Sequence, residues 1–222
     1  MKPKAVTRAV LIALVVLSGA IALPVLFRPF YWWHIEPLGI PEMMDLSVTQ
    51  IKEIYGDLLD YCIGLSDTFS VGCLPFSEEG AAHFADVRNL FILDLAVFAV
   101  AGTALAVLCV KDRKKNVRFA GHTPGFWGAV GLGTGIAILS VFAVIDFDKA
   151  FTVFHKICFP GKDNWAFQSY YDPVILMLPV EFFRNCAILI FAVILISCMG
   201  LLLYDRRRNL GSPSGRAVSE AD

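Results

Sequence analysis

The sequence predicts an all-α integral membrane protein with four transmembrane helices, both termini in the cytoplasm and two outer segments. Its 222 residues are 57% hydrophobic, with a mean hydropathy of +0.64. The apolar residues gather in long blocks, and basic residues cluster between alternate blocks. The formal net charge of −1 says little about partners, and we expect no nucleic-acid partner.

The predicted spans are apolar blocks of sufficient length, since about 20 apolar residues cross a hydrocarbon core of about 30 Å. They cover residues 9–27, 90–110, 126–145 and 185–204. We expect residues 1–208 to form a single four-span domain, followed by a polar cytoplasmic tail at 209–222. In the third span, Gly131 and Gly135 have the spacing that lets helices pack closely.

Basic residues predict the orientation, because Lys-rich and Arg-rich flanks stay in the cytoplasm. They lie near the N-terminus, between the second and third spans, and after the fourth span (Lys2, Lys4, Arg8; Lys111, Arg113, Lys114, Lys115, Arg118; Arg206, Arg207, Arg208, Arg216). Segments 28–89 and 146–184 therefore lie outside. The first span has the basic start of a cleavable signal, but its apolar stretch exceeds a signal core of about 7 to 15 residues, so we expect an anchored helix.

The first outer segment begins with an aromatic belt at residues 28–37, which contains His34 and is typical of the headgroup level. Residues 45–61 predict an amphipathic helix, with Ser47 and Gln50 in capping-box positions. Among the outer cysteines, Cys62 and Cys73 are the favoured disulfide pair, although Cys158 makes the number of outer cysteines odd.

A second helix begins near Ser77, a favourable N-cap residue, and continues into the second span. One face of this helix carries His83, Asp86 and, inside the apolar run, Asp94. Ionisable groups in such runs usually face a bundle interior or a water-filled cavity. This face is therefore a candidate functional surface.

The second outer segment carries a histidine, acids, aromatic residues and prolines between two spans, which is unusual for a simple connector. His155 lies at the outer end of the third span, as His83 lies before the second, whereas we expect His122 to be a solvated or headgroup-level residue on the cytoplasmic side. Histidine exchanges protons near neutral pH, so His83 and His155 are candidates for an acid/base pair. Unrelated structural histidines, or a metal or haem site, remain alternatives.

Two motifs together resemble the lipoprotein intramolecular transacylase (Lit) family of bacterial integral membrane proteins. They are HFADVRNL at residues 83–90 and FHKICFPGKDNWAFQSYYDPVILMLPVEFF at residues 154–183. The matching positions are His83, Asp86-Val87, Phe154-His155, Phe159, Trp165, Asp172-Pro173, Pro179 and Phe182-Phe183. The outer cysteines and the Arg-rich tail depart from the family pattern.

The resemblance implies an enzyme of the bacterial cytoplasmic membrane that acts on its outer face. It would move the sn-2 acyl chain of a diacylglyceryl-modified N-terminal cysteine to the α-amino group of that cysteine, giving a lyso-form lipoprotein. His83 and His155 would be catalytic, and the resemblance implies neither a metal nor another cofactor. Asp86, Asp94, Trp165 and Asp172 are candidates for orienting an imidazole or contacting substrate, while Asp172 is equally suited to a turn or cap.

The implied partners are diacylglyceryl-modified lipoproteins and membrane lipids. A direct transfer needs no acyl-enzyme, because both reacting groups belong to one molecule, and no serine lies in a GxSxG elbow. A tetraspan adhesion or barrier protein remains an alternative, based on the four spans and on Cys62 and Cys73. The sequence leaves open which histidine is the base, which lipoproteins are used and the oligomeric state.

Overall fold

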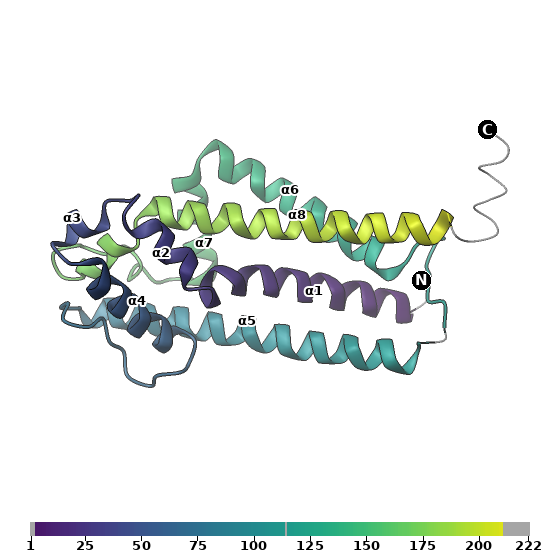
Figure 1. Ribbon diagram of the computed structural model, residues 1–222, viewed down its shortest axis with the longest axis horizontal. Helices are drawn as coiled ribbons and strands as arrows, with labels where there is room; N and C mark the ends of the chain where they lie inside the picture. The colour runs from purple at the N-terminus through teal and green to yellow at the C-terminus, as the bar shows by residue number, and fades with distance from the viewer. Residues whose placement is uncertain (1–2, 114, 211–222) are drawn as a thin grey trace. The chain divides into compact units, whose positions relative to one another are not determined.

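The computed structural model describes residues 3–113 and 115–210, which form helices and no strands (Figure 1). The elements in chain order are α1 (Pro3–Leu26), α2 (Pro29–Ile35), α3 (Ile40–Met44), α4 (Val48–Cys62), α5 (Glu78–Lys111), α6 (Pro124–Ile145), α7 (Phe147–Cys158), η1 (Pro173–Met177) and α8 (Val180–Leu210). Part of the predicted tail, residues 211–222, lies outside the described residues, and α8 includes its first two residues.

Four of these helices, α1, α5, α6 and α8, are long and apolar enough to cross a membrane. They cover the four predicted spans except for residue 27, so the all-α four-span fold class is confirmed. α5 has 34 residues, which at a rise of about 1.5 Å per residue exceeds a hydrocarbon core of about 30 Å. Its first turns, where His83 lies, therefore extend beyond the apolar stretch that spans the bilayer.

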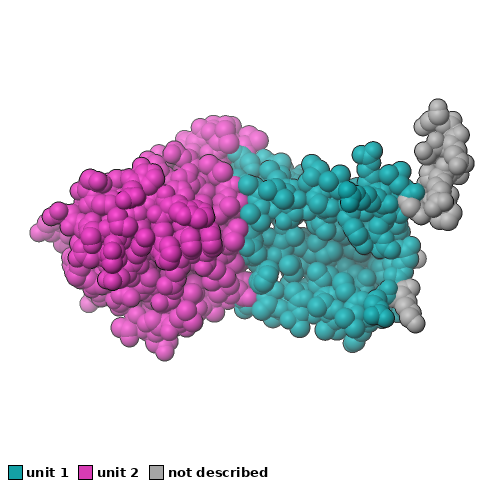
Figure 2. All heavy atoms as spheres, in the orientation of Figure 1, with its two compact units in different colours: residues 1–20, 96–140, 191–222 teal, residues 21–95, 141–190 magenta. Residues whose placement is uncertain are grey.

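The chain divides into two compact units, coloured separately in Figure 2. Unit 1 comprises Met1–Ala20, Ala96–Ser140 and Phe191–Asp222, and unit 2 comprises Ile21–Leu95 and Val141–Ile190. Unit 2 contains α2, α3, α4, α7 and η1 together with the first turns of α5 and α8. The residues of both predicted outer segments thus belong to unit 2.

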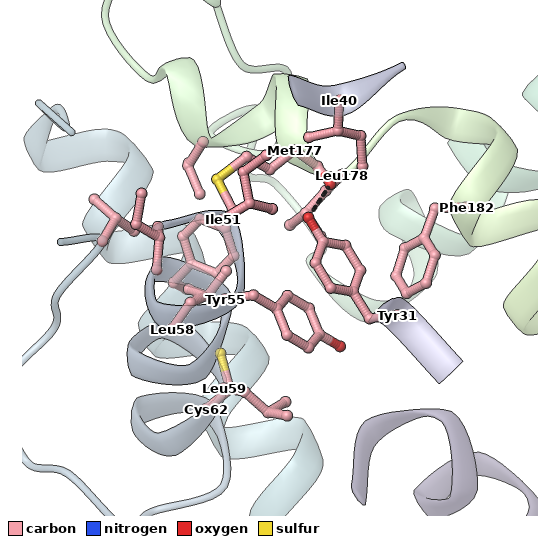
Figure 3. Close-up of a cluster of buried hydrophobic side chains, with 14 of the residues drawn as sticks. Tyr31, Ile40, Ile51, Tyr55, Leu58, Leu59, Cys62, Met177, Leu178 and Phe182 are labelled. Carbon is pink, nitrogen blue, oxygen red and sulfur yellow. Dashed lines mark hydrogen bonds between the residues drawn. The ribbon is translucent and has the colours of Figure 1, made fainter. Parts of the chain in front are cut away.

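Unit 2 has a hydrophobic core to which both outer segments contribute (Figure 3). Tyr31 of α2 stacks on Tyr55 of α4, with ring centroids 3.7 Å apart. The Tyr31 hydroxyl donates a hydrogen bond of 2.9 Å to the Met177 carbonyl of η1, drawn as a dashed line in Figure 3. This buried bond joins the first outer segment to the second.

The amphipathic helix α4 begins as the sequence predicts. The Ser47 hydroxyl accepts from the Gln50 backbone N–H, and the Gln50 side chain accepts from the Ser47 backbone N–H, which completes a capping box. The expected disulfide is wrong, because Cys62 and Cys73 are both free. Cys62 is instead buried in the core, where burial raises the pKa of its thiol to about 12.

In unit 1, a glycine other than the predicted pair makes the close helix contact. A Cβ atom built on Gly128 would lie 2.8 Å from the Ala9 carbonyl oxygen, so α1 and α6 approach closely only because this residue has no side chain. At Gly131 and Gly135, such an atom would meet no described residue within 4 Å. The packing prediction for that pair is therefore wrong, and Gly128, one turn earlier, has that role.

Candidate active site

The start of α5 is fixed by Asp172, which lies just before η1. Its carboxylate accepts hydrogen bonds from the Ser77 backbone N–H at 2.8 Å and from the Ser77 hydroxyl at 2.7 Å. The Ser77 hydroxyl in turn accepts from the Gly80 N–H at 2.9 Å, as an N-cap residue does. Asp172 therefore anchors the helix that carries His83, which is the cap role left open by the sequence.

Gly80 is required for this anchoring. A Cβ atom at this position would lie 2.2 Å from Asp172 Oδ1, a distance that no side chain tolerates without displacing the carboxylate. The two polypeptide segments can approach each other here because residue 80 is glycine. His83 follows one turn later along α5.

His83 is buried among aromatic rings, with 5% of its surface exposed. Its ring makes edge contacts with Phe159 at 4.9 Å and Phe167 at 5.3 Å between centroids. Nδ1 of His83 is buried and has no hydrogen-bond partner among residues 3–113 and 115–210. A buried polar atom without a partner is costly, so this nitrogen is suited to a partner supplied by a substrate.

His155 lies in the last turn of α7, a helix that begins where the Asp146 carboxylate accepts from the Lys149 N–H. Its Nδ1 lies 2.8 Å from the Phe151 carbonyl oxygen, one turn earlier. Because a carbonyl only accepts, Nδ1 carries the proton, and in the neutral ring the lone pair is on Nε2. A free lone pair at a fixed position is what a general base requires.

Burial lowers the pKa of His155 from its ordinary 6.5, while the hydrogen bond to Phe151 opposes that shift. The net direction is downward, so the ring is uncharged at neutral pH. Phe151 and Trp165 flank the imidazole, with ring centroids 4.2 and 4.9 Å away respectively. Trp165 therefore forms part of the wall beside His155, and its Nε1–H is already used by the Lys162 carbonyl at 2.9 Å.

The two histidines lie side by side, with ring centroids 6.0 Å apart and ring planes inclined by 30°. The helix before the second span therefore meets the segment after the third, which brings the two candidate histidines together. Phe159 contacts both imidazoles and so holds their spacing. A single ester group and a neighbouring amine are small enough to contact both rings.

An ion pair missed by the sequence reasoning joins the same two segments. Lys162 Nζ donates to both carboxylate oxygens of Asp86, at 2.7 and 2.6 Å. Asp86 thus pairs with Lys162 instead of orienting an imidazole. Lys162 follows Gly161, whose φ of 74° favours glycine. This glycine just after α7 was the signal in the sequence that the chain could turn here and fold back.

The remaining predicted residue, Asp94, is half-buried further along α5. It lies 11 residues after His83, which at about 1.5 Å per residue places it roughly 16 Å along the helix axis. Asp94 is therefore outside hydrogen-bonding reach of the His83 ring. Of the predicted residues, the structure brings His83, His155 and Trp165 together, and it places Asp86 and Asp172 in contacts that hold the surrounding segments.

The other histidines have separate surroundings. His34 packs on Phe30 and Phe182, and its Nδ1 lies 2.6 Å from the Phe30 carbonyl oxygen. His122 in unit 1 is partly exposed, as we expect from the sequence, but its Nδ1 also lies 2.7 Å from Oδ2 of the buried Asp205. Asp205 follows the fourth predicted span, and no local pattern predicts its pairing with a residue 83 positions earlier.

Comparisons with known proteins identify the family of this chain. The sequence model described as lipoprotein intramolecular transacylase Lit matches residues 6–183. A solved structure of the membrane integral lipoprotein intramolecular transacylase Lit from Bacillus cereus is similar, at 28% identity and a TM-score of 0.83. The match covers 94% of this chain and 96% of that one.

Two further structures of the Bacillus cereus protein carry a substitution of one histidine. The alanine variant matches with 28% identity and a TM-score of 0.76, covering 94% of each chain. The arginine variant matches with 27% identity and a TM-score of 0.76, covering 91% of this chain and 89% of that one. No match was found among curated proteins. The family match over most of the sequence and the shared structure show that this chain belongs to the lipoprotein intramolecular transacylase family of multi-pass membrane acyltransferases.

Proposed function

We propose that the protein transfers the sn-2 acyl chain of a diacylglyceryl-modified N-terminal cysteine to the α-amino group of the same cysteine. The observation that carries this proposal is the paired, buried imidazoles of His83 and His155, 6.0 Å apart between centroids, in a wall of aromatic rings. The product is a lyso-form lipoprotein, with an amide in place of an ester and a free hydroxyl on the glyceryl group. The reaction consumes no water and needs no second substrate.

His155 acts as the base in this proposal. Its Nε2 takes a proton from the α-amino group as the nitrogen attacks the ester carbonyl carbon, and a tetrahedral intermediate forms. The imidazolium then gives that proton to the glyceryl oxygen as the carbon–oxygen bond breaks. The hydrogen bond between Nδ1 and Phe151, 2.8 Å long, supports this assignment because it fixes the lone pair on Nε2.

His83 stabilises the negative oxygen of the intermediate. The neutral ring has one N–H donor, and aromatic rings surround it in place of water. A hydrogen bond in such surroundings is stronger than in water, and removing one oxyanion donor typically costs about 10²-fold to 10³-fold in rate. The unpartnered Nδ1 is consistent with a site that is completed by substrate.

The outer face of the cytoplasmic membrane is the proposed location. The basic clusters predict that Lys162, in unit 2, lies outside the cell and that Arg113, in unit 1, lies in the cytoplasm. A diacylglyceryl substrate keeps its acyl chains in the bilayer and its cysteine amine near water, which suits residues at the outer ends of spans. Labelling of single cysteines at positions 162 and 113 tests this orientation, and labelling of position 162 from the cytoplasm contradicts it.

The decisive test uses the purified full chain and a synthetic diacylglyceryl lipopeptide with an isotopically labelled sn-2 chain. Because transfer within one molecule leaves the mass unchanged, tandem mass spectrometry must locate the label on the amine. We expect the labelled chain on nitrogen with the free amine substrate and no transfer with an N-acetylated control. Label released as free fatty acid, or found on a second molecule, contradicts intramolecular transfer.

The alternative of an adhesion or barrier protein loses one of the features that favoured it. That interpretation used the four spans together with a Cys62–Cys73 pair, and both thiols are free. The family match provides an enzyme activity in its place.

A further inference from the structure

A cavity of about 410 Å³ lies in unit 1, between the first turns of α1 and the end of α5. It is separate from the histidine pair, whose residues all belong to unit 2. Its volume is within the range of about 300 to 1,000 Å³ that small-molecule sites occupy. The basic clusters predict that this end of the helices faces the cytoplasm.

The lining of this cavity is strongly cationic. It includes Lys4, Arg8, Lys111 and Lys115 but only one carboxylate, Asp112, so these side chains carry a net charge of +3. Such an excess around a concave surface favours an anionic ligand. Lys4 and Lys111 form no ion pair with any residue in the described part of the chain.

Arg8 is held in a fixed position at the cavity. Its guanidinium donates to Asp112 at 2.9 Å and to the Leu108 carbonyl at 2.6 Å. Lys115 donates to the other oxygen of Asp112 at 2.8 Å. Nε of Arg8 is buried and has no hydrogen-bond partner within 3–113 and 115–210. The cavity thus combines a fixed guanidinium, which has an unused donor, with two lysines free of ion pairs.

The stretch of α5 beside the cavity carries exposed apolar side chains. Leu108 belongs to the lining, and the nearby side chains of Val107 and Val110 are 44% and 75% exposed. An acyl chain lying along this end of α5 would extend into the bilayer while its headgroup stayed at the cavity. This arrangement favours a lipid over a free ion as the source of the anion.

We propose that the cavity binds the phosphate group of an anionic membrane lipid through Lys4, Lys111 and Arg8. Arginine and lysine are the side chains that commonly bind phosphate oxygens, and basic pockets between transmembrane helices on the cytoplasmic side are known to take lipid headgroups. The site has no part in the acyl transfer. Its ligand stabilises unit 1 by joining the ends of α1 and α5.

The experiment measures thermal unfolding of the purified full chain with short-chain phosphatidylglycerol, phosphatidylcholine or inorganic phosphate. The test variant is Lys4→Gln with Lys111→Gln. Its matched control is Arg206→Gln with Arg207→Gln, which removes the same charge from exposed side chains of α8 outside the cavity. Native mass spectrometry of each protein measures how much anionic phospholipid remains bound.

We expect phosphatidylglycerol, but not phosphatidylcholine, to raise the unfolding midpoint of the wild type and the control. The test variant should bind about 25-fold more weakly, since each lysine near anionic lipid contributes about fivefold. Equal weakening in the control shows attraction by general surface charge and overturns the proposal. If inorganic phosphate at the same concentration raises the unfolding midpoint as much as phosphatidylglycerol does, the site binds a free ion and the assignment to a lipid is overturned. If the test variant binds phosphatidylglycerol as tightly as the wild type, the proposed site itself is overturned.

Discussion

The histidines of the two units differ in what surrounds them. In unit 1, His122 contacts the carboxylate of Asp205 at 2.7 Å, and Asp205 also accepts from the Thr123 N–H at 2.7 Å and from Asn209 at 3.2 Å. In unit 2, His83 and His155 contact aromatic rings and each other, and neither has a hydrogen bond to a carboxylate in the described part of the chain.

This difference separates a structural histidine from the pair that we propose to be reactive. The carboxylate of Asp205 occupies Nδ1 of His122 in a hydrogen bond, so this nitrogen is not available for chemistry. Burial among aromatic rings favours the neutral imidazole and leaves a nitrogen free to accept a proton. The same side chain therefore strengthens a helix junction in one unit and is available for proton transfer in the other.

Removing either member of the reactive pair should have the largest effect. We expect His83→Ala, His155→Ala and the double variant each to lose about 10²-fold to 10⁴-fold of lyso-form production, because groups that act as a unit are not additive. His122→Ala and His34→Ala are matched controls and should keep activity. Mass spectrometry of lipoprotein N-termini and membrane accumulation of each variant provide the readouts, and two modest, multiplicative defects contradict the pair.

Removing the Asp205 carboxylate, which binds His122 in unit 1, should lower stability without affecting the reaction. Asp205→Ala leaves the buried Thr123 N–H without its acceptor, and we expect a loss of about 1 to 3 kcal/mol in the free energy of unfolding. Denaturant titration of the purified protein measures this loss. Activity per folded molecule should stay unchanged. If it falls together with the free energy of unfolding, Asp205 has more than a structural role.

The Lys162–Asp86 pair should have a smaller effect on the reaction, because half of the Lys162 side chain is exposed. Such pairs contribute at most about 1 kcal/mol, which corresponds to about fivefold in rate if it is expressed entirely in positioning the loop. We expect Lys162→Gln to reduce kcat by no more than this, with recovery in Lys162→Arg. A loss as large as that of His155→Ala would instead place Lys162 in contact with the reacting atoms.

The smallest expected effect is on the pH dependence of stability, compared between wild type and His155→Gln. Because the pKa of His155 is lowered on folding, the unfolded chain binds more protons as the pH falls below 6.5. Wild type should therefore lose stability relative to His155→Gln in this range, and the difference should be constant at higher pH. Unfolding midpoints of both proteins measured across this pH range test the prediction. If the wild type instead becomes more stable than His155→Gln as the pH falls, His155 is not a neutral, buried group.

Local patterns in the sequence predict the helical part of this fold well. The apolar blocks locate the four spans, and Ser47 with Gln50 locates the start of α4, since both signals depend on residues close together in the chain. The pairing of His83 with His155 followed from their common position at outer ends of spans and from the family resemblance. The geometry confirms that they meet.

Contacts between distant residues were the part that the sequence did not reveal. Asp86 pairs with Lys162, 76 positions away, and Asp172 pairs with Ser77, 95 positions away, so no periodic pattern marks either partner. Each carboxylate could be recognised as unusual, but its partner is determined by how unit 2 folds. Cys62 was misassigned for a related reason, because spacing alone does not show that a thiol is buried in a core.

In the reaction that we propose, the aromatic wall around the histidines also determines which product forms. An imidazole that deprotonates an amine beside an ester is chemically able to deprotonate water there, and the product would then be a fatty acid and a lipoprotein stripped of one chain. Phe159 and Phe167 contact the ring of His83, and Trp165 contacts that of His155, so these side chains occupy positions that water would otherwise fill. In the proposed reaction, the rings thereby favour attack by the amine over attack by water.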